Sequence, residues 1–243
     1  MNIVAIISRE WSKEIILNLI ADKKNGIKIS LILTTLKTLK KPSNTEVIYL
    51  DKSKDIDQYY KKIKFYEPTF IITYGWSDYI SKDLRDIAPC LILHPSPLPL
   101  YRGGSPIQNQ IINNEINSAV TIILAEDKLD TGDILYQNEI MFTGYLNDIL
   151  KRIINEGTKG TKKIISDFNE NKLIRKSQNN SKATTFNRIS KNELQISPED
   201  FKKQDAEHFY NLIRGFQKPY PRIYIKCKDN TILYLEKVDF DKL

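Results

Sequence analysis

Short, continuous runs of valine, isoleucine and leucine recur along the first half of the chain, and segments with helical spacing separate them. A strand whose side chains are all apolar is buried on both faces, as happens where helices cover each side of a parallel sheet. This order of segments predicts an α/β fold built on a doubly wound, mostly parallel sheet. The runs that we assign to strands are residues 4–7, 29–33, 47–50, 69–74, 90–93 and 119–124.

The last third of the chain has a different character. A helical pattern over residues 146–168 closes the main domain, and a polar segment follows it. Ser197 and Pro198 in "SPED" indicate the start of a further helix, because serine caps helices and proline suits their first turn. Two alternating segments around Asp229-Asn230 indicate a β-hairpin. We therefore predict a main domain at residues 1–190 and a small helix-plus-hairpin appendage at 191–243.

The predicted hairpin has an apolar face formed by the alternating residues Ile223, Ile225, Ile232 and Tyr234. Two strands alone are only marginally stable in water, so this face must pack against something. We expect the appendage to complete a ligand site or to form a dimer interface, and we expect the protein to be a homodimer.

Composition narrows the class of protein further. No apolar run approaches the roughly 18 residues that span a bilayer, and the start, MNIVAIISREW, is charged too soon for a signal peptide. Cys90 and Cys227 are far apart in the sequence, which is typical of a reducing, cytoplasmic setting. Without paired histidines or clustered cysteines, we expect no metal site. The net charge of +7 favours anionic partners, although the lysine clusters are typical of solvated faces.

The most unusual segment is "CLILHPSPLPLYRGGSPIQ" at residues 90–108. Its apolar strand runs directly into His94, and Pro95, Pro97 and Pro99 fix the backbone that follows. Ligands of a doubly wound sheet bind at the carboxyl ends of its strands. A histidine that leaves a strand end and is held by a rigid loop is therefore a candidate catalytic group.

Other strand ends also carry residues that suit a ligand site. Asp130 in "EDKLDTGD" can pair with His94 and fix the tautomer of its ring. Taken alone, this loop of acids and glycine is also what a structural turn requires, and His94 alone could be a packed core residue. The loops after the first strand and after residues 69–74 hold further candidates: Arg9, Trp11, Tyr74, Gly75, Trp76 and Ser77.

Two motifs carry a resemblance to a known family. "HPSPLPLYRGGSPIQ" resembles the H-x-S-L-L-P-x-x-R-G-x-x-P signature of formyltransferases that use 10-formyltetrahydrofolate, and "LDTGDIL" resembles their second signature in the same order. The resemblance implies a Rossmann-like catalytic domain over roughly residues 1–190, which transfers a formyl group from the folate to a primary amine. It also implies that His94 stabilises the tetrahedral oxyanion, while Asp130 orients His94 and helps to accept the amine's proton.

The chain departs from this family at two positions. The family has an asparagine two residues before the histidine as a third catalytic group, and Ile92 stands there. Pro97 replaces the second residue of S-L-L-P. Because isoleucine cannot donate a hydrogen bond, we expect Ser77 to stabilise the oxyanion, with Asn109 or a water molecule as alternatives. A protein that has lost catalysis and only binds anions is a further alternative.

The C-terminal tail indicates which amine is formylated. "HFYNLIRGFQKPYPRIYI" is similar to the "IRA…PYPGA" segment of nucleotide-sugar N-formyltransferases, with Gly215 and Arg222 in place of the usual Ala and Gly. The resemblance implies a nucleotide-linked amino sugar as acceptor, as in lipopolysaccharide or glycan biosynthesis. A methionyl-tRNA or other amine formyltransferase is the alternative, although residues 191–243 are too few for the C-terminal barrel of the tRNA enzymes. We expect neither a membrane nor a nucleic acid as partner.

Residues that bind the two substrates can be suggested as well. By resemblance, the folate would contact Tyr74, Gly75, Trp76, Leu124, Glu126 and Lys128. Arginine suits a diphosphate and a flat ring suits a sugar or base, so we expect four residues to bind the sugar nucleotide. These are Arg9, Trp11, Trp76 and Tyr220. The three aromatic residues could equally belong to the core. Arg102 would hold the proline loop through backbone carbonyls.

Overall fold

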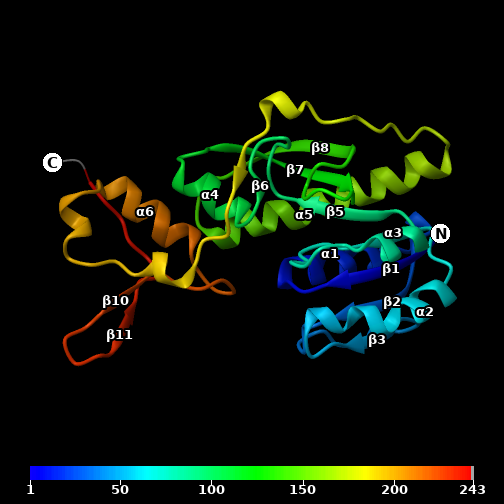
Figure 1. Cartoon of the computed structure of the whole chain (residues 1–243), viewed down its shortest axis with the longest axis horizontal. Helices are drawn as coiled ribbons and strands as arrows, with labels where there is room; N and C mark the ends of the chain where they lie inside the picture. The colour runs from blue at the N-terminus through cyan, green and yellow to red at the C-terminus, as the bar shows by residue number, and fades with distance from the viewer. Residues whose placement is uncertain (242–243) are drawn as a thin grey trace.

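The computed structural model describes residues 1–241 and shows an α/β fold (Figure 1). Seven strands form one sheet in the order β3-β2-β1-β4-β5-β7-β8. The strands β1 to β5 run parallel, whereas β7 and β8 are antiparallel to their neighbours, so the predicted mostly parallel sheet is confirmed. The strands are β1 (Asn2–Ile7), β2 (Lys28–Thr34), β3 (Glu46–Tyr49), β4 (Phe70–Ile72), β5 (Cys90–His94), β7 (Asn117–Leu124) and β8 (Ile134–Met141).

The side chains of β1 alternate between two hydrophobic clusters, one on each face of the sheet. Ile3 and Ile7 lie in the cluster that includes residues of α1 and α5, and Val4 and Ile6 lie in the cluster that includes residues of α2 and α3. Burial on both faces explains why this strand is apolar throughout. The helices are α1 (Glu10–Ala21), α2 (Tyr60–Phe65), α3 (Lys82–Ile87) and α5 (Leu146–Asn169).

The edge strand β8 is not among the predicted strands. Its burial falls from Ile134 to exposed positions at Asn138 and Glu139, so one side of the strand faces solvent. An edge strand of this kind lacks the continuous apolar run that marks a central strand. It nevertheless matters for the site, because β8 places Gln137 beside the loop that follows β5.

The C-terminal residues form a helix and a hairpin around a hydrophobic cluster of their own. The helix α6 (Ala206–Gly215) begins at Ala206, so the predicted start at Ser197 is wrong. Asp205 caps α6 by accepting from the backbone N–H of His208, whereas Ser197 donates to Asp200 in a separate turn. The predicted hairpin is confirmed as β10 (Tyr224–Lys226) and β11 (Ile232–Tyr234). The cluster contains Leu194, Ile196, Phe209, Ile213, Phe216 and Ile223.

The helix α4 (Pro106–Ile112), which follows the proline loop, joins this appendage to the main domain. It packs against α6, and Nε2 of Gln108 donates to the carbonyl of Gly215 at 3.3 Å. The buried guanidinium of Arg214 donates to the backbone carbonyls of Phe142 and Gly144. In Figure 1, α6 therefore lies beside α4 at one end of the molecule. The division near residue 190 stays a prediction.

Residues 170–190 run from the end of α5 back to the appendage, outside β8 (Figure 1). Within this segment the short strand β9 (Thr185–Phe186) pairs with β6 (Arg102–Gly103), which belongs to the loop after β5. Lys176 forms an isolated bridge with Ile134 at the start of β8. This polar segment is thus bound by backbone hydrogen bonds to the loops that carry His94 and Asp130.

Candidate active site

The loop after β5 is fixed by hydrogen bonds along its whole length. Each carbonyl group of residues 95–101 accepts a hydrogen bond from the surrounding protein or from the loop itself. The donors from outside the loop include Gln110 of α4, Thr121 of β7 and Gln137 of β8. Because the three prolines already restrict the backbone, these bonds leave the residues behind His94 little freedom to move.

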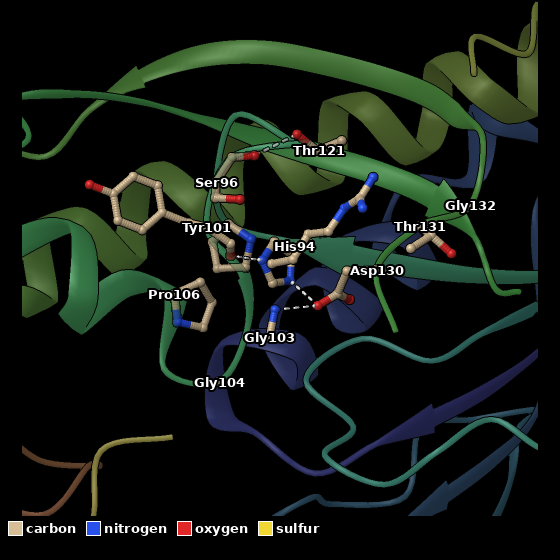
Figure 2. A network of polar contacts seen from close by, with 12 residues as sticks. His94, Ser96, Tyr101, Gly103, Gly104, Pro106, Thr121, Asp130, Thr131 and Gly132 are labelled. Atoms are coloured by element: carbon tan, nitrogen blue, oxygen red, sulfur yellow. Dashed lines mark hydrogen bonds and ion pairs between the residues drawn. The ribbon is translucent and has the colours of Figure 1, made fainter. Parts of the chain in front are cut away.

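His94 is the last residue of β5, and its buried ring lies between two oxygen atoms (Figure 2). Its Nε2 atom is 2.7 Å from the carbonyl oxygen of Tyr101. A carbonyl oxygen can only accept, so Nε2 carries a proton. The Nδ1 atom lies 3.5 Å from Oδ2 of Asp130. Both ring nitrogens therefore face oxygen atoms of the protein.

Asp130 is held in place by its backbone and by its side chain. Its φ of +54° lies in the left-handed region, and its Oδ2 atom accepts from the backbone N–H of Gly103 at 2.8 Å (Figure 2). Two residues on, a Cβ atom at Gly132 would lie 1.8 Å from the carbonyl oxygen of Leu124, so only glycine fits. No donor among the described residues contacts Oδ1 of Asp130, which leaves this atom able to accept a proton from a ligand.

His94 and Asp130 lie on the wall of a cleft with a volume of about 780 Å³. This volume is within the roughly 300–1,000 Å³ that is usual for small-molecule sites. Many of the residues that the sequence suggested line the same cleft. They are Arg9, Trp11, Gly75, Trp76, Ser77, Ile92 and Tyr220.

Contacts between distant parts of the chain build one side of this cleft. The Nε1 atom of Trp11 donates to the hydroxyl of Tyr220 at 3.2 Å, and Nη2 of Arg9 donates to Oγ of Ser77 at 3.2 Å. The guanidinium carbon of Arg9 is also 5.6 Å from the ring centroid of Tyr220, within cation–π range. Burial raises the pKa of the Tyr220 phenol, so this hydroxyl stays neutral near pH 7.

Four of the suggested folate residues do not line the cleft. Tyr74 is fully buried, and its hydroxyl bonds to that of Thr161 at 2.9 Å, so its side chain belongs to the core. Leu124 is buried at the end of β7, and Lys128 is exposed. Glu126 is exposed, and its Oε2 atom lies 3.9 Å from Nη1 of Arg85, which is also outside the cleft lining.

Two further expectations concerned polar side chains near the proline loop. The amide of Asn109 donates to the carbonyls of Gly104 and Asn187, and Asn109 is not part of the cleft lining. The guanidinium of Arg102 donates to the side chains of Gln178 and Asn180 rather than to backbone carbonyls, which corrects the expected contact.

Basic residues of the cleft were missed by the sequence analysis. Arg188 lines it from the polar segment after α5, and Lys191 lines it from the turn that follows this segment. No motif marks them, and lysine or arginine in a polar loop is usually only solvated. With Arg9 they give the cleft three basic side chains, whereas Asp130 is the one carboxylate among its described lining residues. This balance favours an anionic ligand.

Within residues 1–241, no group of three or more His, Cys, Asp and Glu residues could hold a metal ion. The same described residues contain no helix that is long and apolar enough to cross a membrane. Cys90 and Cys227 are both free.

Comparison with known protein families shows which class of protein this chain belongs to. The family described as formyl transferase matches residues 2–167, and this chain belongs to that family of enzymes. The chain is 31% identical to methionyl-tRNA formyltransferase of Clostridium acetobutylicum over 218 residues, which is 87% of this chain and 68% of that protein. It is 32% identical to the enzyme of that name from Campylobacter curvus over 160 residues, which is 66% of this chain and 51% of that protein.

Solved structures with the same fold cover nearly the whole chain. A 4-N formyltransferase from Francisella tularensis has a TM-score of 0.74 at 18% identity and covers 100% of this chain and 98% of that one. Methionyl-tRNA formyltransferase from Clostridium thermocellum has a TM-score of 0.73 at 23% identity and covers 96% of each chain. HypX from Aquifex aeolicus in complex with tetrahydrofolic acid has a TM-score of 0.72 at 16% identity and covers 93% of this chain and 36% of that one.

Proposed function

We propose that this chain transfers a formyl group from 10-formyltetrahydrofolate to the primary amine of a nucleotide-linked amino sugar. The observation that carries this proposal is the position of the His94–Asp130 pair on the wall of a basic, aromatic cleft. The family supports formyl transfer, and the named complex of HypX with tetrahydrofolic acid supports a folate as the donor.

The reaction requires three events that these residues can support. The amine attacks the formyl carbon, a C–N bond forms, and the carbonyl oxygen becomes an oxyanion. The amine loses a proton to Oδ1 of Asp130, and His94, whose Nδ1 atom faces Oδ2, holds that carboxyl group in place. The intermediate then collapses, the carbonyl re-forms, the bond from the formyl carbon to the folate nitrogen breaks, and that nitrogen receives the proton that Asp130 took from the amine.

The oxyanion needs a donor other than the ring of His94, whose Nε2 proton is given to Tyr101. Ile92 lines the cleft and has no donor. Ser77 also lines the cleft, and its oxygen already accepts from Arg9, so its own proton is free to point at the formyl oxygen. We therefore assign Ser77 as the oxyanion donor. A preorganised donor of this kind contributes roughly 100- to 1,000-fold in rate.

The acceptor is assigned from the chemistry of the other residues that line the cleft. Arg9, Arg188 and Lys191 suit a diphosphate, and Trp76 and Tyr220 suit a sugar ring or base. Trp11 also lines the cleft but is 5% exposed and belongs to the core, where it supports Tyr220 through a hydrogen bond. The folate would lie against Gly75 and Trp76, and Leu129, which is 63% exposed on the cleft wall, adds apolar surface.

Methionyl-tRNA is the second candidate acceptor. The named activity of the curated relatives and the net charge of +7 favour it. The chain spans 68% and 51% of those relatives, so part of each relative has no counterpart in the matched region.

The proposed activity is tested by incubating the protein with 10-formyltetrahydrofolate and a panel of uridine-, thymidine- and guanosine-diphosphate amino sugars. We expect one formyl group on at least one sugar, detected by mass spectrometry, and no product with the corresponding hydroxy sugars. Absence of product from every sugar would overturn the proposal.

Two properties of the whole protein are also proposed. The hairpin residue Leu233 is 54% exposed and lines neither cleft, and we propose that the hairpin packs through Leu233 against a second copy in a homodimer. Light scattering should then show a dimer, and Leu233→Lys should convert it to a monomer. The free thiols of Cys90 and Cys227 agree with a cytoplasmic location.

A further inference from the structure

We propose that a second cleft, next to the first, binds the nucleoside part of the acceptor, an inference that rests on the proposed function. The second cleft has a volume of about 550 Å³ and lies between the hairpin and the loop that follows α6. It shares Lys191, Leu194, Tyr220 and Pro221 with the main cleft. A ligand that fills the main cleft can therefore continue into the second one.

The lining of the second cleft combines cations with aromatic rings. Its three basic side chains are Lys191, Lys218 and Arg222, and its described lining residues include no carboxylate. Its three rings are those of Tyr220, Tyr224 and Tyr234. Cations suit phosphate and flat rings suit a nucleobase, so the shared chemistry of this lining is that of a nucleotide.

The side chain of Arg222 is held in place by two contacts within the protein, in a position from which it can contact a nucleobase. Its guanidinium carbon lies 3.8 Å from the ring centroid of Tyr234, and Nη1 donates to Glu236. The stacked guanidinium and phenol present a flat surface, on which a base can stack through dispersion and cation–π attraction. Lysine at this position would keep the charge and lose the plane.

The positions of the two clefts determine where each part of the ligand would lie. The amine lies at His94 and Asp130, the diphosphate passes the basic residues Arg188 and Lys191, and the base reaches Arg222. A sugar, two phosphates and a nucleoside occur in this order in a nucleotide-linked sugar. The same geometry explains why residues of the tail line both clefts.

The test compares Arg222→Lys and Tyr234→Ala with Lys226→Ala, an exposed position on the same hairpin outside both clefts. Calorimetry with nucleoside diphosphates and with inorganic pyrophosphate measures what the base adds. We expect wild type and Lys226→Ala to bind nucleoside diphosphate at least about 10-fold more tightly than pyrophosphate. Arg222→Lys and Tyr234→Ala should lose most of that preference and leave pyrophosphate binding unchanged.

Steady-state kinetics separates this inference from the proposed function. Both variants should raise KM for the nucleotide-linked sugar about 10-fold and leave kcat and the KM for folate unchanged. If the enzyme formylates such sugars but both variants match wild type, the second cleft is wrong and the function stands. If no nucleotide-linked sugar is formylated, the function fails and the inference fails with it.

Gln178, in the segment after α5, provides an independent observation. Its Nε2 atom donates to the backbone carbonyls of Asp130 at 2.9 Å and Gly132 at 2.8 Å. Its Oε1 atom accepts from Nε and Nη2 of Arg102 at 3.2 and 2.7 Å. One amide group thus joins the loop of Asp130 to the loop of His94.

We infer that Gln178 is a positioning residue that sets the approach of Asp130 to His94. Arg102 is 8% exposed and stands next to Gly103, whose N–H binds Oδ2 of Asp130. A shift of Gln178 would move both ends of that contact. A displacement of about 1 Å in a catalytic group can cost roughly 100-fold in rate. The Gln178 amide therefore affects the rate of formyl transfer without contacting a substrate.

Gln178→Glu and Asn180→Ala form a matched pair of variants. Glutamate keeps an oxygen for Arg102 but replaces the N–H donors with an acceptor that faces two carbonyls. Asn180 accepts from the same guanidinium but does not touch the loop of Asp130. We expect Gln178→Glu to lower kcat about 10- to 100-fold with little change in either KM, and Asn180→Ala to lower it less than about 3-fold.

A spectroscopic readout distinguishes positioning from loss of structure. The chain has two histidines, His94 and His208, and His208 lies on α6. In spectra of ¹⁵N-labelled imidazole, Gln178→Glu should shift the ring resonances of His94 and leave those of His208 in place. The inference fails if His94 gives the wild-type resonances, or if kcat is retained, in the folded variant. Should Gln178→Glu not fold, Gln178→Met removes the same two donors without adding charge and takes its place.

Discussion

The indole Nε1 of Trp11 donates to the hydroxyl of Tyr220 at 3.2 Å and joins the first helix to a loop 209 residues away. This bond brings the tail of the chain onto the wall of the cleft that contains His94 and Asp130. The appendage therefore contributes to the site itself, in addition to packing against α4.

Tyr220→Ala should weaken binding of the acceptor while leaving the folate site intact. Loss of the ring removes aromatic surface from both clefts, so KM for the nucleotide-linked sugar should rise roughly 5- to 10-fold. Tyr220→Phe keeps the ring and loses only the bond to Trp11, which should cost about 1 kcal/mol in the free energy of unfolding. Equal KM values for acceptor in wild type and Tyr220→Ala would exclude Tyr220 from the binding site.

His94→Asn and Asp130→Asn should each reduce formyl transfer at least roughly 100-fold. His94 is fixed between Tyr101 and Asp130, and Asp130 holds the free carboxylate oxygen that takes the amine's proton. Thermal unfolding should show that both variants fold. Turnover near the wild-type value in both would mean that the pair is not the catalytic centre.

Ser77→Ala should lower kcat much more than it weakens binding of either substrate, because its contact with the formyl oxygen strengthens only in the transition state. The hydroxyl lies on the cleft wall with its oxygen already bonded to Arg9. If Ser77→Ala is fully active, another donor, such as a water molecule, stabilises the oxyanion.

Ile92→Asn tests the same assignment from the opposite direction. Ile92 is half-buried and packs against the cluster of Leu98, Ile123 and Ile134, so an amide there has no prepared partner and should not raise turnover. A large gain in kcat would show instead that the site lacks a donor and that Ser77 does not replace it.

Gly132→Ala should inactivate the enzyme through the backbone of the Asp130 loop. The new Cβ would lie 1.8 Å from the carbonyl oxygen of Leu124, so the loop must shift, and we expect roughly a 100-fold loss in kcat. Gly26→Ala is the control, because a Cβ atom there would have no atom within 4 Å, although the φ of +67° strains a residue with a side chain. It should cost about 1 kcal/mol in stability and leave kcat unchanged. An active Gly132→Ala would show that the loop tolerates displacement.

The central sheet could be predicted because burial on both faces forces continuous apolar runs, as in β1 and β5. The edge strand β8 could not, since solvent on one side lets Gln137 and Asn138 stand within it. The start of α6 was misplaced because "SPED" has the residues of a helix start, but Asp200 binds Ser197 in a separate turn and Asp205 caps the helix.

In the site, His94 and Asp130 could be predicted because His94 ends a strand, Asp130 lies in the loop after another strand, and both belong to long motifs. Arg188, Lys191 and Gln178 could not, because their roles come from where residues 170–191 cross the site rather than from any local pattern. Tyr74 shows the opposite limit. It lies two residues after the end of β4, but its side chain turns into the core and bonds to Thr161.

The choice of acceptor is the central claim, and one measurement tests it most directly. The values of kcat/KM should be determined for nucleotide-linked amino sugars and for methionyl-tRNA, with 10-formyltetrahydrofolate as donor at one salt concentration. We predict that at least one nucleotide-linked sugar is preferred over methionyl-tRNA by about 100-fold or more. A higher kcat/KM for methionyl-tRNA, together with tRNA binding that weakens steeply with salt, would contradict the proposed function.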